Sequence, residues 1–229
     1  MKLLCISDLH GDLAALEKLS GEMADSDLIL CAGDFTDFGG RADMLRMLGP
    51  LLPRRSSLAA VAGNCDRAEA RKALEAEDLS VDGRARIFDF PSGAMTVIGA
   101  GGGLFRTGLT PYERREGELV GAFESAMHEL EGPRRPSAFL IALSHQPPLD
   151  CGADLRHGSH VGSRGLRNIL DSLKPVLWVC GHIHEGRSVS RVEETLVVNP
   201  GSLREGFYAR GRLEPGNSAA SIQMELKSL

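Results

Sequence analysis

The chain has 229 residues, of which 42% are hydrophobic and 25% are charged, so its composition excludes a disordered or fibrous protein. A chain of this length is expected to form one domain, residues 1–229. Its net charge of −5 argues against a protein that binds nucleic acid over its whole surface, because such proteins are normally basic. An anionic substrate remains compatible with this charge, because bound metal ions can reverse the sign of a cleft.

The cysteines are scattered and form no Cys-x-x-Cys pair, so neither a disulfide framework nor a thiolate zinc site is expected. Cys5, Cys31 and Cys180 fall in apolar runs, where a reduced thiol packs as a small hydrophobic group. The apolar residues 1–7 are too few for a signal peptide or a membrane span. We therefore expect a cytoplasmic protein with no membrane contact.

Apolar runs alternate with helical patterns in the first half of the chain. Strands are predicted at 2–7, 27–32 and 57–62, and helices follow them at about 12–24, 40–49 and 66–77. Asp12 is the expected N-cap of the first helix, whose Leu13, Leu16 and Leu19 recur on one face. Alternating strands and helices are typical of βαβ units, which form a largely parallel sheet covered by helices.

The second half of the chain has a different pattern. Residues 84–90 and 94–99 predict a hairpin around Pro91-Ser92-Gly93. Next come a helix at about 113–131, a loop broken by proline at 132–136, a strand at 138–143, a helix at 163–173 and a strand at 176–180. Antiparallel strands are predicted at 187–192, 195–198, 206–213 and 219–226. The predicted fold is α/β, with two sheets packed face to face and helices outside.

Five of the predicted strands end in a side chain that can bind a metal ion. These ends are Asp8-Leu9-His10, Gly33-Asp34, Gly63-Asn64, Ser144-His145 and Gly181-His182-Ile183-His184. Open α/β sheets place their sites at the carboxyl ends of strands, so we expect these groups to converge on one crevice. The glycines before Asp34, Asn64 and His182 allow sharp turns and a close approach of the backbone.

The candidate ligands offer only oxygen and nitrogen donors. They are Asp8, His10, Asp34, Asn64, His145, His182 and His184. This set suits manganese, iron, nickel, cobalt or zinc rather than a structural thiolate site. Seven groups are too many for one ion, but they fit two ions that share a carboxylate. Two metal ions ~4 Å apart are the usual clamp for in-line displacement at phosphorus.

These motifs occur in a characteristic order along the chain. The set also includes Gly33-Asp34-Phe35-Thr36-Asp37-Phe38-Gly39, Gly63-Asn64-Cys65-Asp66 and Asn199-Pro200-Gly201-Ser202. In this respect the chain resembles the calcineurin-like metallophosphoesterase superfamily over nearly its full length. The resemblance implies a four-layer αββα sandwich with two mixed β-sheets flanked by helices. It also implies two divalent ions, with manganese favoured. Asp8, His10, Asp34 and His184 would hold one ion, and Asp34 (bridging), Asn64, His145 and His182 would hold the other.

The sequence departs from this pattern at Cys65, where many members of the superfamily have histidine. Small bacterial and archaeal members with Gly-Asn-Cys-Asp look like phosphodiesterases. A thiol with a pKa of ~8.5 donates a proton less readily than an imidazolium with a pKa of ~6.5. We therefore expect Cys65 to favour diesters or good leaving groups, and Asn64, Cys65, Asp66 and His145 are the candidate catalytic residues.

The expected reaction is hydrolysis of a small anionic phosphodiester or nucleotide by a hydroxide that bridges the two ions. His157 or His160 is a candidate for the missing general acid. A nuclease and a non-catalytic scaffold with this fold are the alternatives. The short acidic chain argues against the first, and the complete ligand set argues against the second. The sequence is compatible with a monomer and with a homo-oligomer.

Several further residues have both a functional and a structural interpretation. Gly101-Gly102-Gly103 would either cradle a phosphate or form a turn, and Arg106, Arg114 and Arg115 would either line a cleft or lie on the surface. Asp37 and Asp66 are expected to orient groups around the metal site, and Asn199 is a candidate hydrogen-bond partner of His184. A nucleophilic role for Cys65 is not expected, because no separate base is evident.

Overall fold

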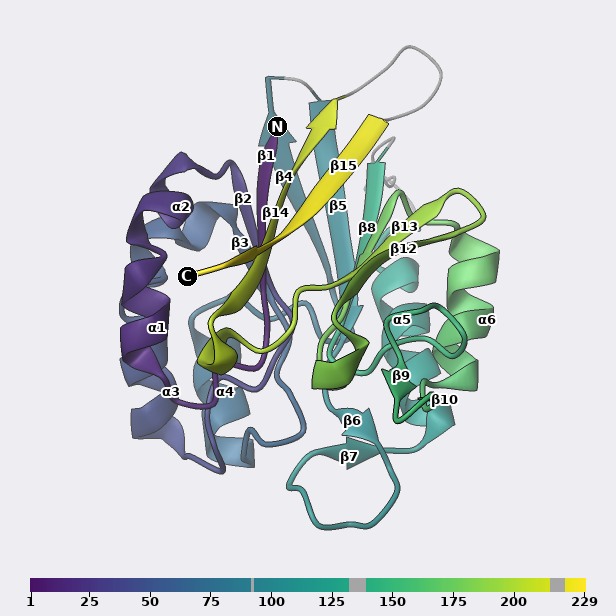
Figure 1. The fold of residues 1–229 in the computed structure, drawn as a ribbon, viewed down its shortest axis with the longest axis horizontal. Helices are drawn as coiled ribbons and strands as arrows, with labels where there is room; N and C mark the ends of the chain where they lie inside the picture. The colour runs from purple at the N-terminus through teal and green to yellow at the C-terminus, as the bar shows by residue number, and fades with distance from the viewer. Residues whose placement is uncertain (92, 132–138, 215–220) are drawn as a thin grey trace.

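The computed structural model describes residues 1–91, 93–131, 139–214 and 221–229. Two mixed β-sheets pack face to face, and helices cover the outer face of each (Figure 1). Helices α1 to α4 cover one sheet, and α5 and α6 cover the other. The predicted four-layer αββα sandwich is therefore confirmed.

The first sheet has the strand order β15-β14-β1-β2-β3. Strands β1, β2 and β3 are parallel, as the βαβ pattern predicts, whereas β14 and β15 join as an antiparallel hairpin beside β1. The bounds are β1 Lys2–Ile6, β2 Leu28–Cys31, β3 Leu58–Ala60, β14 Phe207–Glu214 and β15 Ser221–Ser228.

The second sheet has the order β12-β13-β11-β8-β5-β4. Its four central strands are parallel, and an antiparallel strand closes each edge. The bounds are β4 Ala85–Phe90, β5 Gly93–Ala100, β8 Phe139–Ser144, β11 Leu177–Val179, β12 Ser188–Val192 and β13 Thr195–Asn199. The predicted hairpin of β4 and β5 is confirmed. Ser92, the loop at 132–136 and the first residues of the strands predicted at 138–143 and 219–226 lie outside the described residues.

Side chains alternate between two faces along each central strand, as the period of a strand requires. In β1, Leu3 and Cys5 pack between the two sheets, and Leu4 and Ile6 pack under the helices. In β11, Leu177 and Val179 face the other sheet, whereas Trp178 packs against the outer helices. Three apolar layers therefore hold the four layers of secondary structure together.

The helices are α1 Leu13–Lys18, α2 Ser20–Asp25, α3 Arg41–Leu48, α4 Ala68–Ala76, α5 Glu116–His128 and α6 Arg164–Leu173. The single helix predicted at 12–24 is wrong, because the chain breaks at Leu19, just before Ser20 and Gly21. The predicted N-cap is confirmed, since Asp12 Oδ1 accepts a hydrogen bond from the Ala15 amide at 3.0 Å.

Helix α5 begins at Glu116 rather than at the predicted residue 113. Residues Glu113–Arg114 form the short strand β7, which pairs with β6 (Gly103–Leu104). The Glu113 carboxylate accepts hydrogen bonds from the backbone amides of 106–110, which ties this segment to the preceding loop. The helix then starts where Glu118 accepts a hydrogen bond from the Arg115 amide at 2.6 Å.

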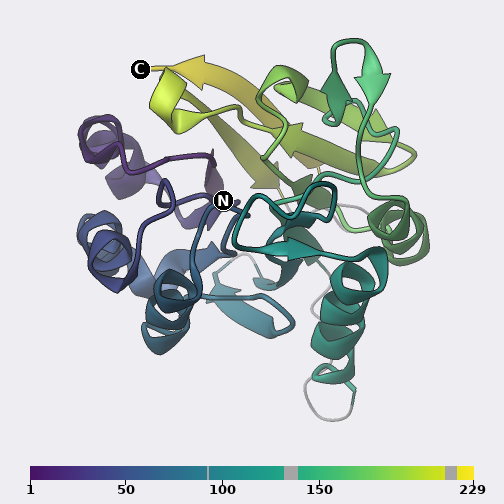
Figure 2. The ribbon, with the colours of Figure 1, turned by 90° about the horizontal axis from the view of Figure 1, so that it is seen from below.

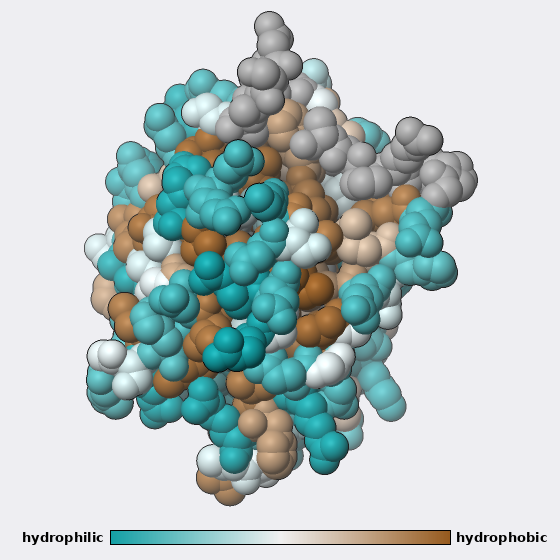
Figure 3. Space-filling model, turned by 90° about the vertical axis from the view of Figure 1, so that its right-hand side faces the viewer, coloured by the Kyte–Doolittle hydropathy of each residue, from teal (hydrophilic) through white to brown (hydrophobic). Residues whose placement is uncertain are grey.

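The carboxyl ends of β1, β2, β3, β8 and β11 meet at one end of the sandwich, which Figure 2 shows from below. Two short segments project there: the first contains the parallel pair of β6 and β7, and the second is the antiparallel hairpin of β9 (Leu155–Arg156) and β10 (Ser159–His160). Hydrophobic residues lie at the outermost tip of the first segment, among hydrophilic neighbours (Figure 3). Phe105 and Leu109 are 55% and 79% exposed. Among the described residues, every helix is too short or too polar to cross a lipid bilayer.

Candidate metal centre

All seven predicted ligands lie at this end of the sandwich, each in the segment that follows a strand. Asp8 and His10 follow β1, Asp34 follows β2, and Asn64 follows β3. His145 follows β8, and His182 and His184 follow β11, where His184 begins the short 3-10 helix η2 (His184–Gly186). The parallel arrangement of these strands explains why residues far apart in the sequence meet.

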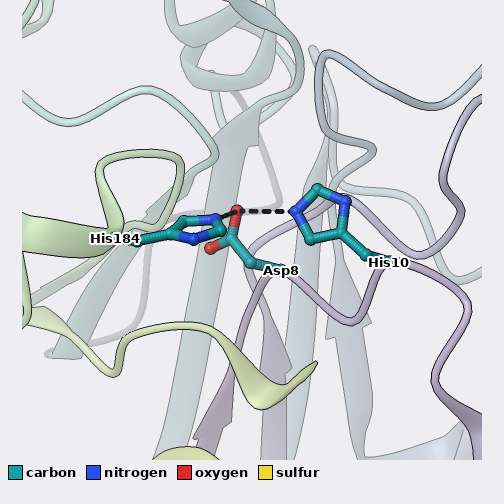
Figure 4. Close-up of side chains that lie close together, drawn as sticks. All are labelled: Asp8, His10 and His184. Atoms are coloured by element: carbon teal, nitrogen blue, oxygen red, sulfur yellow. Dashed lines mark ion pairs between the residues drawn. The ribbon is translucent and has the colours of Figure 1, made fainter. Parts of the chain in front are cut away.

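Asp8, His10 and His184 form one group of donors (Figure 4). The Oδ1 atom of Asp8 lies 3.3 Å from Nε2 of His184 and 4.0 Å from Nε2 of His10. The two imidazole rings lie on either side of the carboxylate, with centroids 5.5 Å apart. One ion between the two rings would therefore be within reach of all three side chains.

Asp34, Asn64 and His145 form a second group. The Nε2 atom of His145 lies 3.5 Å from Oδ2 of Asp34 and 2.8 Å from Oδ1 of Asn64. The His182 ring packs edge-on against His145, with centroids 5.0 Å apart. Oδ2 of Asp34 also lies 3.7 Å from Nε2 of His10, so this carboxylate stands between the two groups.

The donor set fits divalent metal ions. Two ligands bound at ~2.1 Å with near-right-angle or tetrahedral geometry lie ~3.0–3.5 Å apart, close to several of the separations observed here. Asp8 and Asp34 are 1% and 2% exposed, and a buried carboxylate requires a compensating charge. The His10 Nδ1 atom is buried and has no hydrogen-bond partner among the described residues. The geometry and the burial thus agree with the chemistry of the donors.

Four of the seven donors have backbone φ in the left-handed region: Asp8 (53°), His10 (43°), Asp34 (51°) and His182 (66°). This conformation is uncommon except for glycine, although Asn, Asp and His adopt it more readily than other residues. Asp8 is held there by a hydrogen bond from its amide to the Gly33 carbonyl at 3.0 Å. Such local strain, fixed by the surrounding fold, is typical of functional sites.

Two of the predicted close approaches of the backbone are confirmed. A Cβ atom on Gly63 would lie 2.0 Å from Oδ1 of Asp34, and one on Gly181 would lie 1.8 Å from the Ser7 hydroxyl oxygen. The same position on Gly181 is 2.6 Å from Oδ2 of Asp8. Any larger residue at these positions would therefore displace a candidate ligand.

The two carboxylates and the histidines perturb each other strongly. Burial alone would raise the pKa of Asp34, but the neighbouring His145 outweighs burial and holds that pKa well below its usual range. Burial likewise opposes the charge on His145, yet Asp34 and Asp8 raise its pKa to about 9. The hydrogen bond to Asp8 raises the pKa of His184 to about 9. In the metal-free protein, protons on these two rings compensate the negative charge of the carboxylates. Bound divalent ions would compensate the same charge.

His182 shows the opposite shift. Its burial, followed by repulsion from His145, lowers its pKa to about 4. The ring is consequently neutral at neutral pH, which is the protonation state that a metal ligand requires.

Neighbouring groups orient the candidate ligands. Nδ1 of His145 donates to the Ala32 carbonyl at 2.7 Å, which leaves Nε2 facing the site. The Asp66 carboxylate accepts hydrogen bonds from the amides of Phe35, Thr36 and Gly63. It therefore links the turn that carries Asp34 to the turn that carries Asn64, which agrees with the expectation that Asp66 orients loop groups. Burial, with the charge of Asp34, raises the pKa of Asp66 to about 6.

One predicted supporting role is wrong. Asn199 forms no hydrogen bond with His184, because its amide donates to the carbonyls of Ala153 and Ile183. The partner of His184 is Glu205, at the end of the 3-10 helix η3 (Leu203–Glu205), with Oε1 3.2 Å from Nδ1. Asp37 pairs with Arg204 of the same η3 turn at 3.5 Å, so its partner is a loop residue rather than a histidine, and an orienting role for Asp37 stays a prediction. Glu205 was missed because no strand end or motif marks it in the sequence.

Cys65 is buried next to Asp34, and its amide donates to Oδ1 of that residue at 2.8 Å. Its sulfur forms a third close group with His10 and Asp34. Burial and the charge of Asp34 raise the pKa of this thiol far above its usual range. The thiol therefore stays protonated at neutral pH, which agrees with the expectation that Cys65 is not a nucleophile.

The glycine run and the arginines have structural partners. The amides of Gly102 and Gly103 donate to the carbonyls of Ala62 and Tyr112, so these two amides are not available to a phosphate. Arg114 pairs with Asp82 at 2.8 Å, and Arg106 donates to the Val161 carbonyl at 2.9 Å. Arg115 forms the N-cap of α5.

The two candidate acids lie in the β9–β10 segment, and their ion-pair partners are carboxylates outside the donor groups. His157 is largely exposed and lies 3.3 Å from the Glu185 carboxylate. His160 pairs with Asp154 at 2.9 Å and with Asp150 at 3.3 Å. Neither ring contacts a candidate metal ligand, so the geometry gives no support to either as the general acid.

A protein-family model described as calcineurin-like phosphoesterase matches residues 1–186. The chain belongs to this family. It is a family of divalent-metal-dependent phosphoesterases that act on phosphate esters, and the donor groups described above are this chain's candidate ligands.

The curated protein MJ1162 of Methanocaldococcus jannaschii is 32% identical over 205 residues, which cover 87% of this chain and 88% of that protein. Among solved structures, TT1561 of Thermus thermophilus superposes with a TM-score of 0.66 at 16% identity, covering 97% of both chains. The 5′-nucleotidase from Candida albicans has a TM-score of 0.56 at 13% identity and covers 97% of this chain and 50% of that one. At such low identity the structural matches establish the fold alone.

Proposed function

We propose that the protein is a phosphodiesterase that holds two divalent ions, with manganese favoured, and hydrolyses a small phosphodiester or nucleotide. Asp8, His10, Asp34 and His184 hold one ion, and Asp34, Asn64, His145 and His182 hold the other. One observation carries this assignment: Oδ2 of Asp34 lies within 3.7 Å of His10 Nε2 and 3.5 Å of His145 Nε2, so one carboxylate faces both groups.

Bound ions of this kind supply Lewis acidity toward phosphoryl oxygens and lower the pKa of a hydrolytic water to about 7. Other residues of the chain orient the side chains that would hold the ions. The hydrogen bond from His145 Nδ1 to Ala32 directs Nε2 into the site, and Asn64 lies 2.8 Å from that atom. Asp66 keeps the two turns that carry Asp34 and Asn64 in register through its hydrogen bonds with Thr36 and Gly63.

Cys65 supports the preference for a diester. Its protonated, buried thiol is a poor donor to a leaving oxygen compared with a histidine at the same position. A substrate with a good leaving group does not need that proton.

The decisive experiment is turnover by reconstituted protein. The chain is stripped of metal with a chelator, reloaded with manganese, nickel or cobalt, and assayed with bis(p-nitrophenyl) phosphate, p-nitrophenyl phosphate and cyclic nucleotides. We expect metal-dependent hydrolysis that is faster with the diester. His145→Ala should lower turnover by about 100-fold or more. His128→Ala, which removes an exposed histidine, is the matched control.

Absence of turnover with every substrate and every metal would contradict the proposal and favour a scaffold. Faster hydrolysis of the monoester than of the diester would contradict the diester preference alone.

A further inference from the structure

A cavity of about 290 Å³ opens beside the metal centre. It is lined by Arg156, His182, Ile183, His184 and Glu185. Because His182 and His184 are candidate ligands, a molecule in this cavity would lie next to the bound ions. Its volume is near the lower end of the ~300–1,000 Å³ of small-molecule sites, so it suits a compact ligand.

Among the described residues, Arg156 is the one arginine or lysine that lines the cavity. Within the described ranges, its guanidinium has no ion pair and donates no hydrogen bond. The neighbouring carboxylate of Glu185 is engaged instead by His157, through the backbone amide at 2.9 Å and the ring at 3.3 Å. The wall of the cavity therefore carries a permanently charged guanidinium that has no ion-pair partner among the described residues.

The backbone that carries Arg156 is firmly held. Asp154, which is fully buried, accepts hydrogen bonds from the amides of Asp150 at 2.9 Å and Gly162 at 3.1 Å. The same carboxylate lies 2.9 Å from Nδ1 of His160. The segment is also linked to the neighbouring loop, because Arg106 donates to the Val161 carbonyl. Arg156 is thus a free side chain on an ordered support, as a ligand-binding residue requires.

The charge of the site indicates what Arg156 binds. Among the proposed ligands only Asp8 and Asp34 carry a negative charge, so two divalent ions would leave the ligand shell with excess positive charge. A further cation beside these ions is repelled by them, and an anion between the two would turn that repulsion into attraction. Arg156 is exposed, whereas His182 and His184 are only partly so, which places the guanidinium at the outer part of the cavity. The group it meets is therefore distinct from the phosphoryl group at the ions.

We propose that Arg156 binds a second phosphate group on a substrate whose scissile phosphoryl group is held at the metal centre. The planar guanidinium matches two phosphate oxygens at once, which an ammonium does not. This inference rests on the proposed function for the identity of the scissile group, and it narrows the substrate class to phosphate esters with two phosphate groups.

The test measures binding by calorimetry to manganese-loaded protein, with free manganese held constant. The probes are bisphosphonates with one to three methylene groups between the phosphorus atoms, each compared with the alkylphosphonate of equal chain length. We expect at least one bisphosphonate to bind about tenfold more tightly than its single-phosphonate partner. Arg156→Ala should abolish this difference and leave alkylphosphonate binding unchanged, and Arg156→Lys should retain only part of it.

Arg191→Ala is the matched control, because Arg191 is an exposed arginine whose hydrogen bond stays within its own hairpin. Equal weakening of both probe classes in Arg156→Ala would overturn the proposal, because Arg156 would then bind the phosphoryl group at the ions. No weakening of either class, or no bisphosphonate that binds more tightly than its partner, would overturn it as well. Turnover of bis(p-nitrophenyl) phosphate by the same preparations tests the proposed function separately from the role of Arg156. If there is no turnover, the proposed function is contradicted, and the calorimetric comparison alone tests whether Arg156 binds a second phosphate group.

Discussion

The carboxylate of Glu205 lies 3.2 Å from Nδ1 of His184, while Nε2 of the same ring lies 3.3 Å from Asp8. An acidic partner at one ring nitrogen fixes the tautomer and directs the other nitrogen toward the metal. The β1 end and the η3 turn, which are far apart in the sequence, thus act on one histidine from opposite sides.

Glu205→Ala should weaken metal binding without unfolding the protein. Loss of such an orienting partner lowers metal affinity or activity by about 10–100-fold in comparable sites. Manganese titration of the metal-free protein measures the change, with Glu194→Ala, an exposed glutamate of the β12–β13 hairpin, as control. Equal affinities of the wild type and Glu205→Ala would show that His184 needs no such support.

Asp66→Asn should destabilise the metal-free protein by about 1–3 kcal/mol, because an amide group replaces one acceptor oxygen and leaves a buried donor unpaired. Asp66 accepts from the amides of Phe35, Thr36 and Gly63, and from the Thr36 hydroxyl. Denaturant unfolding of both proteins gives the difference. If Asp66→Asn and the wild type have equal free energies of unfolding, the hydrogen bonds of Asp66 do not hold the two turns together.

The positions of the ligands could be predicted because they depend on strand ends, which apolar runs mark clearly. A short run such as 27–32, bounded by turn residues, fits a buried strand, and the residues after parallel strands must meet at one edge. The same logic located Asp34 and His145 without any contact information. The period of the strands and the turn residues after them thus sufficed to predict the layers and to place the candidate donors at one end of the sandwich.

The remaining features depend on tertiary contacts that leave no local pattern. Glu205 reaches His184 only because β14 pairs with β1, which brings the preceding η3 turn against the site. The late start of α5 reflects hydrogen bonds that the Glu113 and Glu118 carboxylates accept from nearby backbone amides, which compete with helix formation. Arg156 stands on a two-residue strand whose partner is another two-residue strand, too short to be recognised in the sequence.

Cys65→His should raise monoester hydrolysis relative to diester hydrolysis, because an imidazolium protonates a poor leaving group more readily than a thiol does. The ratio of kcat/KM for p-nitrophenyl phosphate to that for bis(p-nitrophenyl) phosphate measures the shift, which we expect to be about tenfold or more. Cys151→Ser, a buried cysteine outside the donor groups, is the control. An unchanged ratio would refute the role given to Cys65.

His160 and Asp154 should stabilise the β9–β10 segment in a pH-dependent way. The hydrogen bond to Asp154 raises the pKa of His160, and Asp150 also faces the ring. Burial would raise the pKa of Asp154, but His160 and the backbone amides lower it. The histidine contribution is therefore complete below its unfolded pKa of ~6.5 and is lost as pH rises through its folded value. The aspartate contribution is complete above ~3.9 and is lost as pH falls through its lowered folded value.

The difference in Tm between the wild type and His160→Ala should consequently be largest between about pH 4 and 6.5 and should shrink at higher pH. Thermal unfolding of the metal-free proteins across this range tests the sign, with His128→Ala as the exposed control. A difference that grows as pH rises would mean that the pair does not stabilise the segment.

The central claim is that Asp34 lies between two metal ions, and a crystal of the protein grown with excess manganese tests it most directly. Anomalous scattering should locate two manganese ions on opposite sides of this carboxylate, one beside His10 and His184 and the other beside Asn64 and His145. A map with no ion at Asp34, or with the seven side chains directed away from each other, would contradict the account.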